Sequence, residues 1–147
     1  MIIGLISDTH NEPDNVIKHV VKELVEIHHV EMIFHEGDIE KQHLDAALFG
    51  GLPVYCALNQ EQLEKEAFRT APPGWTFTSP GDSRIQDVRG LRCYIGHKFS
   101  FDLAAGPEAR FKDKLNELRR RNDGLRYVFA GHMHHRALVQ TQLVTFI

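Results

Sequence analysis

Polar side chains follow four predicted strands of this sequence, each at the point where the strand ends. The predicted strands, residues 1–6, 31–34, 53–57 and 127–130, are short apolar runs of the kind that form buried strands. The side chains that come after them are two carboxylates, three imidazoles and one amide, namely Asp8, His10, Asp38, Asn59, His132 and His134. Because strand ends in an open α/β sheet converge on one crevice, we expect these side chains to lie together.

A cluster of nitrogen and oxygen donors without a thiolate predicts a metal site. Such a set suits Mn, Fe, Zn or Mg and disfavours soft metals and iron–sulfur clusters. With this many ligands, two ions can share one carboxylate. Two ions about 3.5–4 Å apart can polarise a phosphoryl oxygen, hold a hydroxide nucleophile and neutralise the leaving oxygen. A simpler role is open for Asp8 and Asn59, since an Asp or Asn just past a strand also caps the helix that follows.

The elements that position these side chains predict an α/β fold in one domain, residues 1–147. Apolar residues at helical spacing predict helices from Pro13 to about His29 and from Pro107 to the stop at Asn122. Alternation of helices with strands indicates a parallel sheet. The other predicted elements are a short helix at 42–48, a hairpin turn at Arg89-Gly90, and strands at 75–78, 84–88, 91–95, 138–140 and 143–147.

Composition excludes several classes of function. With 17 basic and 20 acidic residues the net charge is −3, which provides no electrostatic footprint for nucleic acid except as a substrate. No apolar run approaches the roughly 20 residues of a membrane helix, and the start of the chain lacks a signal peptide. We therefore expect a cytoplasmic protein without membrane contact. Cys56 and Cys93 lie far apart inside apolar runs and are interpreted as buried thiols.

The motifs Asp8-Thr9-His10, Gly37-Asp38, Asn59 and Gly131-His132-Met133-His134, in this order, resemble the calcineurin-like metallophosphoesterases. The resemblance is to the small bacterial and archaeal phosphodiesterase branch, which also includes a retromer subunit, and it covers essentially the whole chain. It implies a four-layer α/β/β/α sandwich of two mixed sheets, with a dinuclear metal centre at the top of the sheets.

The resemblance also implies a role for each residue. Asp8, His10 and His134 would bind the first ion, Asp38 would bridge, and Asn59 and His132 would bind the second ion. The implied activity is hydrolysis of a phosphodiester or phosphomonoester bond in a small phosphorylated substrate by a metal-bound hydroxide. The implied cofactors are two divalent ions, with Mn favoured over Fe, Zn, Ni or Mg.

Two departures from the family pattern bear on activity. The family's Gly-Asn followed by His or Cys appears here as Leu58-Asn59-Gln60, and Gln60 cannot donate a proton usefully. The family's His-Gly-His appears as Ile95-Gly96-His97. This alignment places Ile95 where the second ion expects an imidazole, and it places His97 near the substrate phosphate as a catalytic residue beside Asn59. We therefore expect a weakened second site unless water or His97 replaces the ligand. The alternative function is a weakened metal-binding scaffold for protein–protein interaction.

The other histidines and the end of the chain give further expectations. His35 and His135 lie beside the motifs and could orient a ligand. The predicted helices carry four more histidines, which we expect at the surface: His19, His28, His29 and His43. The sequence stops at Phe146-Ile147, where the family usually continues with an Asn-Pro-Gly-Ser turn and a further strand. A missing strand exposes a sheet edge, so we expect a homodimer to cover it.

Overall fold

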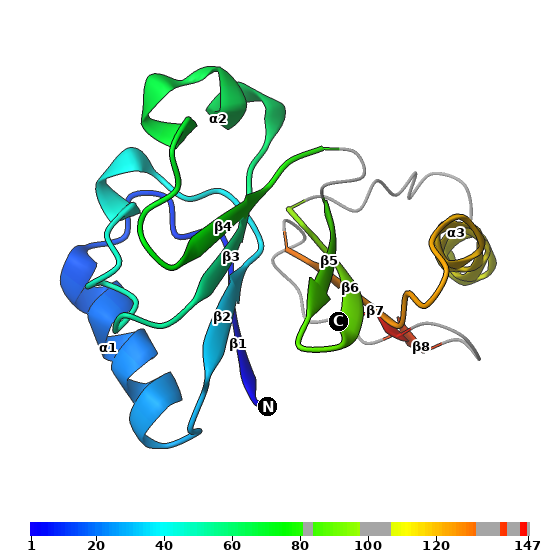
Figure 1. The fold of residues 1–147 in the computed structure, drawn as a ribbon, viewed down its shortest axis with the longest axis horizontal. Helices are drawn as coiled ribbons and strands as arrows, with labels where there is room; N and C mark the ends of the chain where they lie inside the picture. The colour runs from blue at the N-terminus through cyan, green and yellow to red at the C-terminus, as the bar shows by residue number, and fades with distance from the viewer. Residues whose placement is uncertain (81–83, 98–106, 132–138, 141–144, 147) are drawn as a thin grey trace.

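Two β-sheets pack face to face between two groups of helices in the computed structural model of the chain (Figure 1). The structure describes residues 1–80, 84–97, 107–131, 139–140 and 145–146. Within these residues, α1 and α2 cover the outer face of the first sheet and α3 covers the outer face of the second (Figure 1). The expected four-layer α/β/β/α sandwich is confirmed.

The first sheet has the strand order β1-β2-β3-β4, with every described pair parallel. Its strands are β1 (Ile3–Ile6), β2 (Met32–His35), β3 (Val54–Ala57) and β4 (Trp75–Thr78). The connections are α1 (Asp14–Glu26), the 3-10 helix η1 (Lys41–His43), and α2 (Gln60–Glu64) with the 3-10 helix η2 (Glu66–Phe68). Each connection crosses over one face and returns the chain in the same direction, so the described strands of this sheet are all parallel. The resemblance implied a mixed sheet here, and the structure corrects that expectation.

The second sheet is mixed, with the order β5-β6-β7-β9-β8. A hairpin joins β5 (Ile85–Val88) to β6 (Leu91–Gly96), and α3 (Pro107–Arg121) joins β6 to the parallel β7 (Tyr127–Ala130). Two short strands, β8 (Val139–Gln140) and β9 (Thr145–Phe146), complete the sheet. Arg89 and Gly90 both have positive φ, which is the backbone of a two-residue hairpin turn.

Three apolar cores hold these layers together. Ile17 and Val21 of α1 pack with Ile33 of the first sheet, and Leu115 of α3 packs with Val128 of the second. The central core lies between the sheets and contains Met32, Phe34, Ala57, Val88, Cys93, Ile95 and Phe129. Strand alternation therefore separates the two faces of each sheet, and both sheets end in loops at the same edge.

The sequence predictions differ from the structure in the helices after β2 and β3. The region predicted as a helix at 42–48 contains η1 followed by turns, and α2 was not predicted. The four residues of β1 lie at an edge of the described first sheet. The expected homodimer stays a prediction. Among the described helices, none is long and apolar enough to span a membrane.

Candidate metal centre

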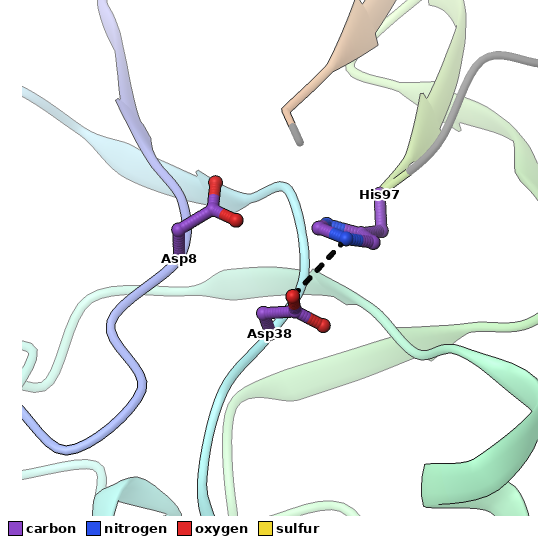
Figure 2. A group of neighbouring side chains, drawn as sticks. All are labelled: Asp8, Asp38 and His97. Carbon is purple, nitrogen blue, oxygen red and sulfur yellow. Dashed lines mark ion pairs between the residues drawn. The ribbon is translucent and has the colours of Figure 1, made fainter. Parts of the chain in front are cut away.

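Asp8, Asp38 and His97 come together where three strands end. Asp8 follows β1, Asp38 follows β2, and His97 follows β6 of the other sheet. One ligand atom from each lies within 4.8 Å of the others (Figure 2). The expected meeting of Asp8 with Asp38 is therefore observed, and His97 joins them from across the central core.

The contacts of His97 fit a cation beside it. Its Nδ1 lies 2.9 Å from the Glu36 carbonyl oxygen, which can only accept, so Nδ1 carries a hydrogen and donates it. Its Nε2 lies 3.2 Å from Asp38 Oδ2. His97 Nε2 and Asp38 Oδ2 are thus a nitrogen and an oxygen donor close enough for one metal ion to bind both. A backbone carbonyl that orients a ligating imidazole is a common partner in metal sites.

His10 approaches the same carboxylates from the solvent side. Its Nε2 lies 3.9 Å from Asp8 Oδ1 and 3.7 Å from Asp38 Oδ2, and half of its side chain is exposed. An imidazole and two carboxylates at these distances form a nitrogen and oxygen donor set suited to Mn, Fe, Zn or Mg.

The backbone that carries these donors is held in the left-handed region. Asp8, His10 and Asp38 have φ of 54°, 33° and 51°, and Gly37 has φ of 107°. Each such non-glycine residue costs on the order of 1 kcal/mol, and such strain gathers at functional sites. Two backbone hydrogen bonds link the loops. Asp8 N donates to Gly37 O and His10 N donates to Asp38 O, and each donor–acceptor distance is 3.0 Å.

Gly37 also makes room for His97. A Cβ added to Gly37 would lie 2.3 Å from His97 Cβ. Gly131, the last described residue before the predicted ligands His132 and His134, is packed similarly, since its added Cβ would lie 2.8 Å from Ser7 Cβ and 3.2 Å from Glu36 O. The end of β7 therefore reaches the same loops.

Asn59 performs the capping role that the sequence left open. Its Oδ1 accepts a hydrogen bond from Gln62 N at a distance of 2.8 Å, and Gln62 Oε1 accepts one from Asn59 N at 2.9 Å. The two bonds form a capping box at the start of α2. Its Nδ2 donates to Asp38 Oδ1 over 3.2 Å. Asn59 thus contacts the expected bridging residue, while its amide oxygen is held by the helix. Gln60 is exposed at the first residue of α2.

The expected position of Ile95 at the second metal site is wrong. Ile95 is fully buried in the central core between the sheets, together with Phe34 and Phe129. The difference is one of position along the strand, because Ile95 lies inside β6 whereas His97 lies two residues further on, past the end of β6 where the loops begin. His97, one of the replacements that the sequence left open for the missing imidazole, lies beside Asp8 and Asp38. A weakened second site stays a prediction.

Three predicted residues, His132, His134 and His135, lie outside the described residues. Two other histidines are buried. His43, expected at the surface, is 1% exposed, and its Nε2 donates to Glu12 O over 2.9 Å. His35 accepts from Gly37 N at Nδ1 over 3.3 Å and has Nε2 3.1 Å from Thr9 Oγ1, so it holds the loops as a neutral ring.

The electrostatics of the buried groups next to the cluster oppose ionisation. Burial lowers the pKa of His35 to about 3. Burial, aided by the negative charge of Asp8, raises the pKa of Glu36 to about 8. Sequence reasoning missed Glu36, although a Glu directly before Gly37-Asp38 at the end of a buried strand is a visible signal.

Comparisons with known proteins agree with this fold. A search of curated proteins found no significant match. A conserved uncharacterised protein from Streptococcus pneumoniae, a predicted phosphoesterase, matches with 16% identity and a TM-score of 0.55 over 98% of this chain and 68% of its own. An archaeal phosphodiesterase matches with 17% identity and a TM-score of 0.61 over 100% of this chain and 82% of its own. A Thermotoga maritima protein matches with 17% identity and a TM-score of 0.55 over 98% and 80%.

These structural likenesses show the shared fold. The model of the calcineurin-like phosphoesterase superfamily domain matches residues 1–147, the whole length of the chain. The same residues form the two-sheet sandwich and carry Asp8, Asp38 and His97 at the ends of their strands. The chain therefore belongs to the calcineurin-like phosphoesterase superfamily.

Proposed function

We propose that the protein is a metal-dependent phosphoesterase that hydrolyses phosphodiester or phosphomonoester bonds at the centre formed by Asp8, Asp38 and His97. The observation that carries this proposal is the close approach of His97 Nε2 to Asp38 Oδ2, 3.2 Å, between two sheets whose ends share one site. A divalent ion bound there would polarise a phosphoryl oxygen and lower the pKa of a water molecule.

The two oxygens of Asp38 support a bridging role and therefore a dinuclear centre. Oδ2 faces His10 and His97, and Oδ1 faces Asn59 Nδ2. Because the two oxygens of this carboxylate face different groups, each oxygen could bind a different metal ion. His132 and His134 would complete the ligand set, as the family pattern implies.

The remaining residues suggest how the substrate is handled. Both ring nitrogens of His97 have partners in Glu36 and Asp38, which favours a ligand role over proton donation. Water would then protonate the leaving oxygen. The half-exposed His10 lies at the open side, where a substrate phosphate would approach. Mn is the favoured metal because carboxylate oxygens form much of the donor set. A cytoplasmic location stays a prediction.

A metal and substrate panel tests the proposal. We would strip the protein with a chelator, add Mn, Mg, Zn, Fe or Ni, and assay aryl phosphodiesters, cyclic nucleotides and aryl phosphomonoesters. Turnover that requires added metal and is lost in Asp38→Ala is expected. Metal binding with no turnover of any member of the panel would contradict the proposal and support the metal-binding scaffold.

A further inference from the structure

Glu36 is a buried carboxylate at the centre of the loops that hold the candidate metal ligands. Its backbone N–H donates to Ile6 O over 2.8 Å, which continues the β1–β2 pairing by one residue. Its carbonyl oxygen accepts from His97 Nδ1, and Asp38 follows two residues later. The residue is therefore fixed by both sheets.

The Glu36 side chain lies on the inner side of the first sheet. Alternation along β2 places Phe34 in the central core and Ile33 in the core under α1. Since Glu36 follows Phe34 by two residues in continued strand pairing, alternation directs its side chain to the same inner face.

The surroundings leave this carboxyl group unsatisfied. Glu36 is 7% exposed, and its Oε1 is buried without a hydrogen-bond partner among the described residues. The charge that acts on it is negative, that of Asp8. A buried polar group normally has a partner, and two neighbouring carboxylates in a dry site normally share a cation or a proton.

We propose that Glu36 supplies a further carboxylate oxygen to the metal centre of Asp8, Asp38 and His97, and that it makes this centre prefer Mn²⁺ or Mg²⁺ to Zn²⁺. Glu36 lies outside the group of atoms within 4.8 Å, so its side chain would have to rotate for an oxygen to bind the ion. A third carboxylate makes the donor set harder, which favours oxygen-seeking ions. This inference rests on the proposed function, because it assigns the metal of the same site.

Titration with Mn²⁺ and Zn²⁺ of chelator-stripped protein tests the inference. We would measure dissociation constants by calorimetry and the Mn²⁺ spectrum by electron paramagnetic resonance. Glu36→Gln keeps the shape and removes the carboxylate. Glu36→Asp keeps the charge and withdraws the oxygens by one methylene. Glu40→Gln is the matched control, because Glu40 is a half-buried Glu of the same loop that is not in the cluster.

We expect Glu36→Gln and Glu36→Asp to weaken Mn²⁺ binding at least tenfold and Zn²⁺ binding much less, and to change the Mn²⁺ spectrum. Glu40→Gln should match the parent within twofold. Glu36→Gln without metal should melt above the parent, which also shows that it folds. Unchanged Mn²⁺ binding in Glu36→Gln, or loss in Glu36→Gln but not in Glu36→Asp, would overturn ligation by Glu36.

Failure of the proposed function gives a different result. In that case the parent binds Mn²⁺ no better than Asp38→Ala, and no substrate is turned over. If the Glu36 inference alone is wrong, the parent and Glu40→Gln bind Mn²⁺, Asp38→Ala does not, and Glu36→Gln behaves as the parent.

Discussion

His97 Nε2 lies 3.2 Å from Asp38 Oδ2, and this contact joins the end of the second sheet to the end of the first. Its other nitrogen donates to Glu36 O, so the ring is held from both sides. Such a ring cannot move away from Asp38 without breaking a hydrogen bond. The pair therefore presents a fixed nitrogen and oxygen donor set to a metal ion.

His97→Ala should lower metal affinity by at least about 10- to 100-fold, because loss of a direct ligand should cost no less than loss of a residue that only supports one. Calorimetric titration with Mn²⁺ measures the effect. The control is Ile95→Val, which should cost about 0.5–1.5 kcal/mol of unfolding free energy because Ile95 is a core residue. Equal metal affinity in His97→Ala and the parent would remove His97 from the centre.

Gly37→Ala should disrupt the site as well as the fold. The added Cβ would lie 2.3 Å from His97 Cβ, in addition to the strain of φ at 107°. Gly74→Ala is the matched control, because Gly74 has φ of 80° and nothing within 4 Å of an added Cβ. The control should lose about 1 kcal/mol from backbone strain alone. Urea unfolding with and without Mn²⁺ measures both, and equal losses in the two variants would contradict the contact.

Asn59 can be tested for its two contacts separately. Asn59→Ala should lose about 1 kcal/mol of unfolding free energy with the cap of α2, whereas Asn59→Ser keeps a capping oxygen and should lose little. Both variants lose the amide beside Asp38, so both should bind the second ion less tightly. Urea unfolding and Mn²⁺ titration give the two numbers. An Asn59→Ser variant with unchanged metal stoichiometry and affinity would leave Asn59 with the cap alone.

Much of the fold follows from the sequence because its strands are short, continuous apolar runs and α1 and α3 have clear apolar faces. The helix α2 was missed because its five residues are too few for periodicity to show. The meeting of Asp8 with Asp38 could be predicted from strand ends in one parallel sheet. His97 was expected at the site, but near the substrate phosphate, and its contact with Asp38 was not foreseen. The matching of the Ile95-Gly96-His97 motif also failed to show that Ile95 lies in the core between the sheets.

The metal-free protein should show two opposite pH dependences that offset each other between about pH 4.5 and 6.5. His35 has its pKa lowered from 6.5 to about 3, so the unfolded state takes up a proton first and stability falls as the pH falls. Glu36 has its pKa raised from 4.5 to about 8, so the folded state keeps a proton longer and stability falls as the pH rises. Each slope is at most about 1.4 kcal/mol per pH unit.

Single variants separate the two slopes. Relative to the parent, Glu36→Gln should lose stability more steeply on acidification below pH 6.5, and His35→Gln should lose it more steeply as the pH rises above 4.5. Thermal unfolding in chelator across this range is the measurement. Parallel curves of stability against pH for the parent and both variants would contradict the prediction, because they would show that the pKa of neither group changes on folding.

The most direct test of the account is the rate of hydrolysis of bis-p-nitrophenyl phosphate by chelator-stripped protein reloaded with Mn²⁺, compared with Asp38→Asn prepared in the same way. Asn keeps the size of Asp38 but lacks the charge that both candidate ions would share. We expect metal-dependent turnover in the parent and a loss of at least about 100-fold in kcat/KM in the variant, which is about 2.7 kcal/mol of transition-state stabilisation. Equal turnover by the parent and Asp38→Asn would contradict this expectation.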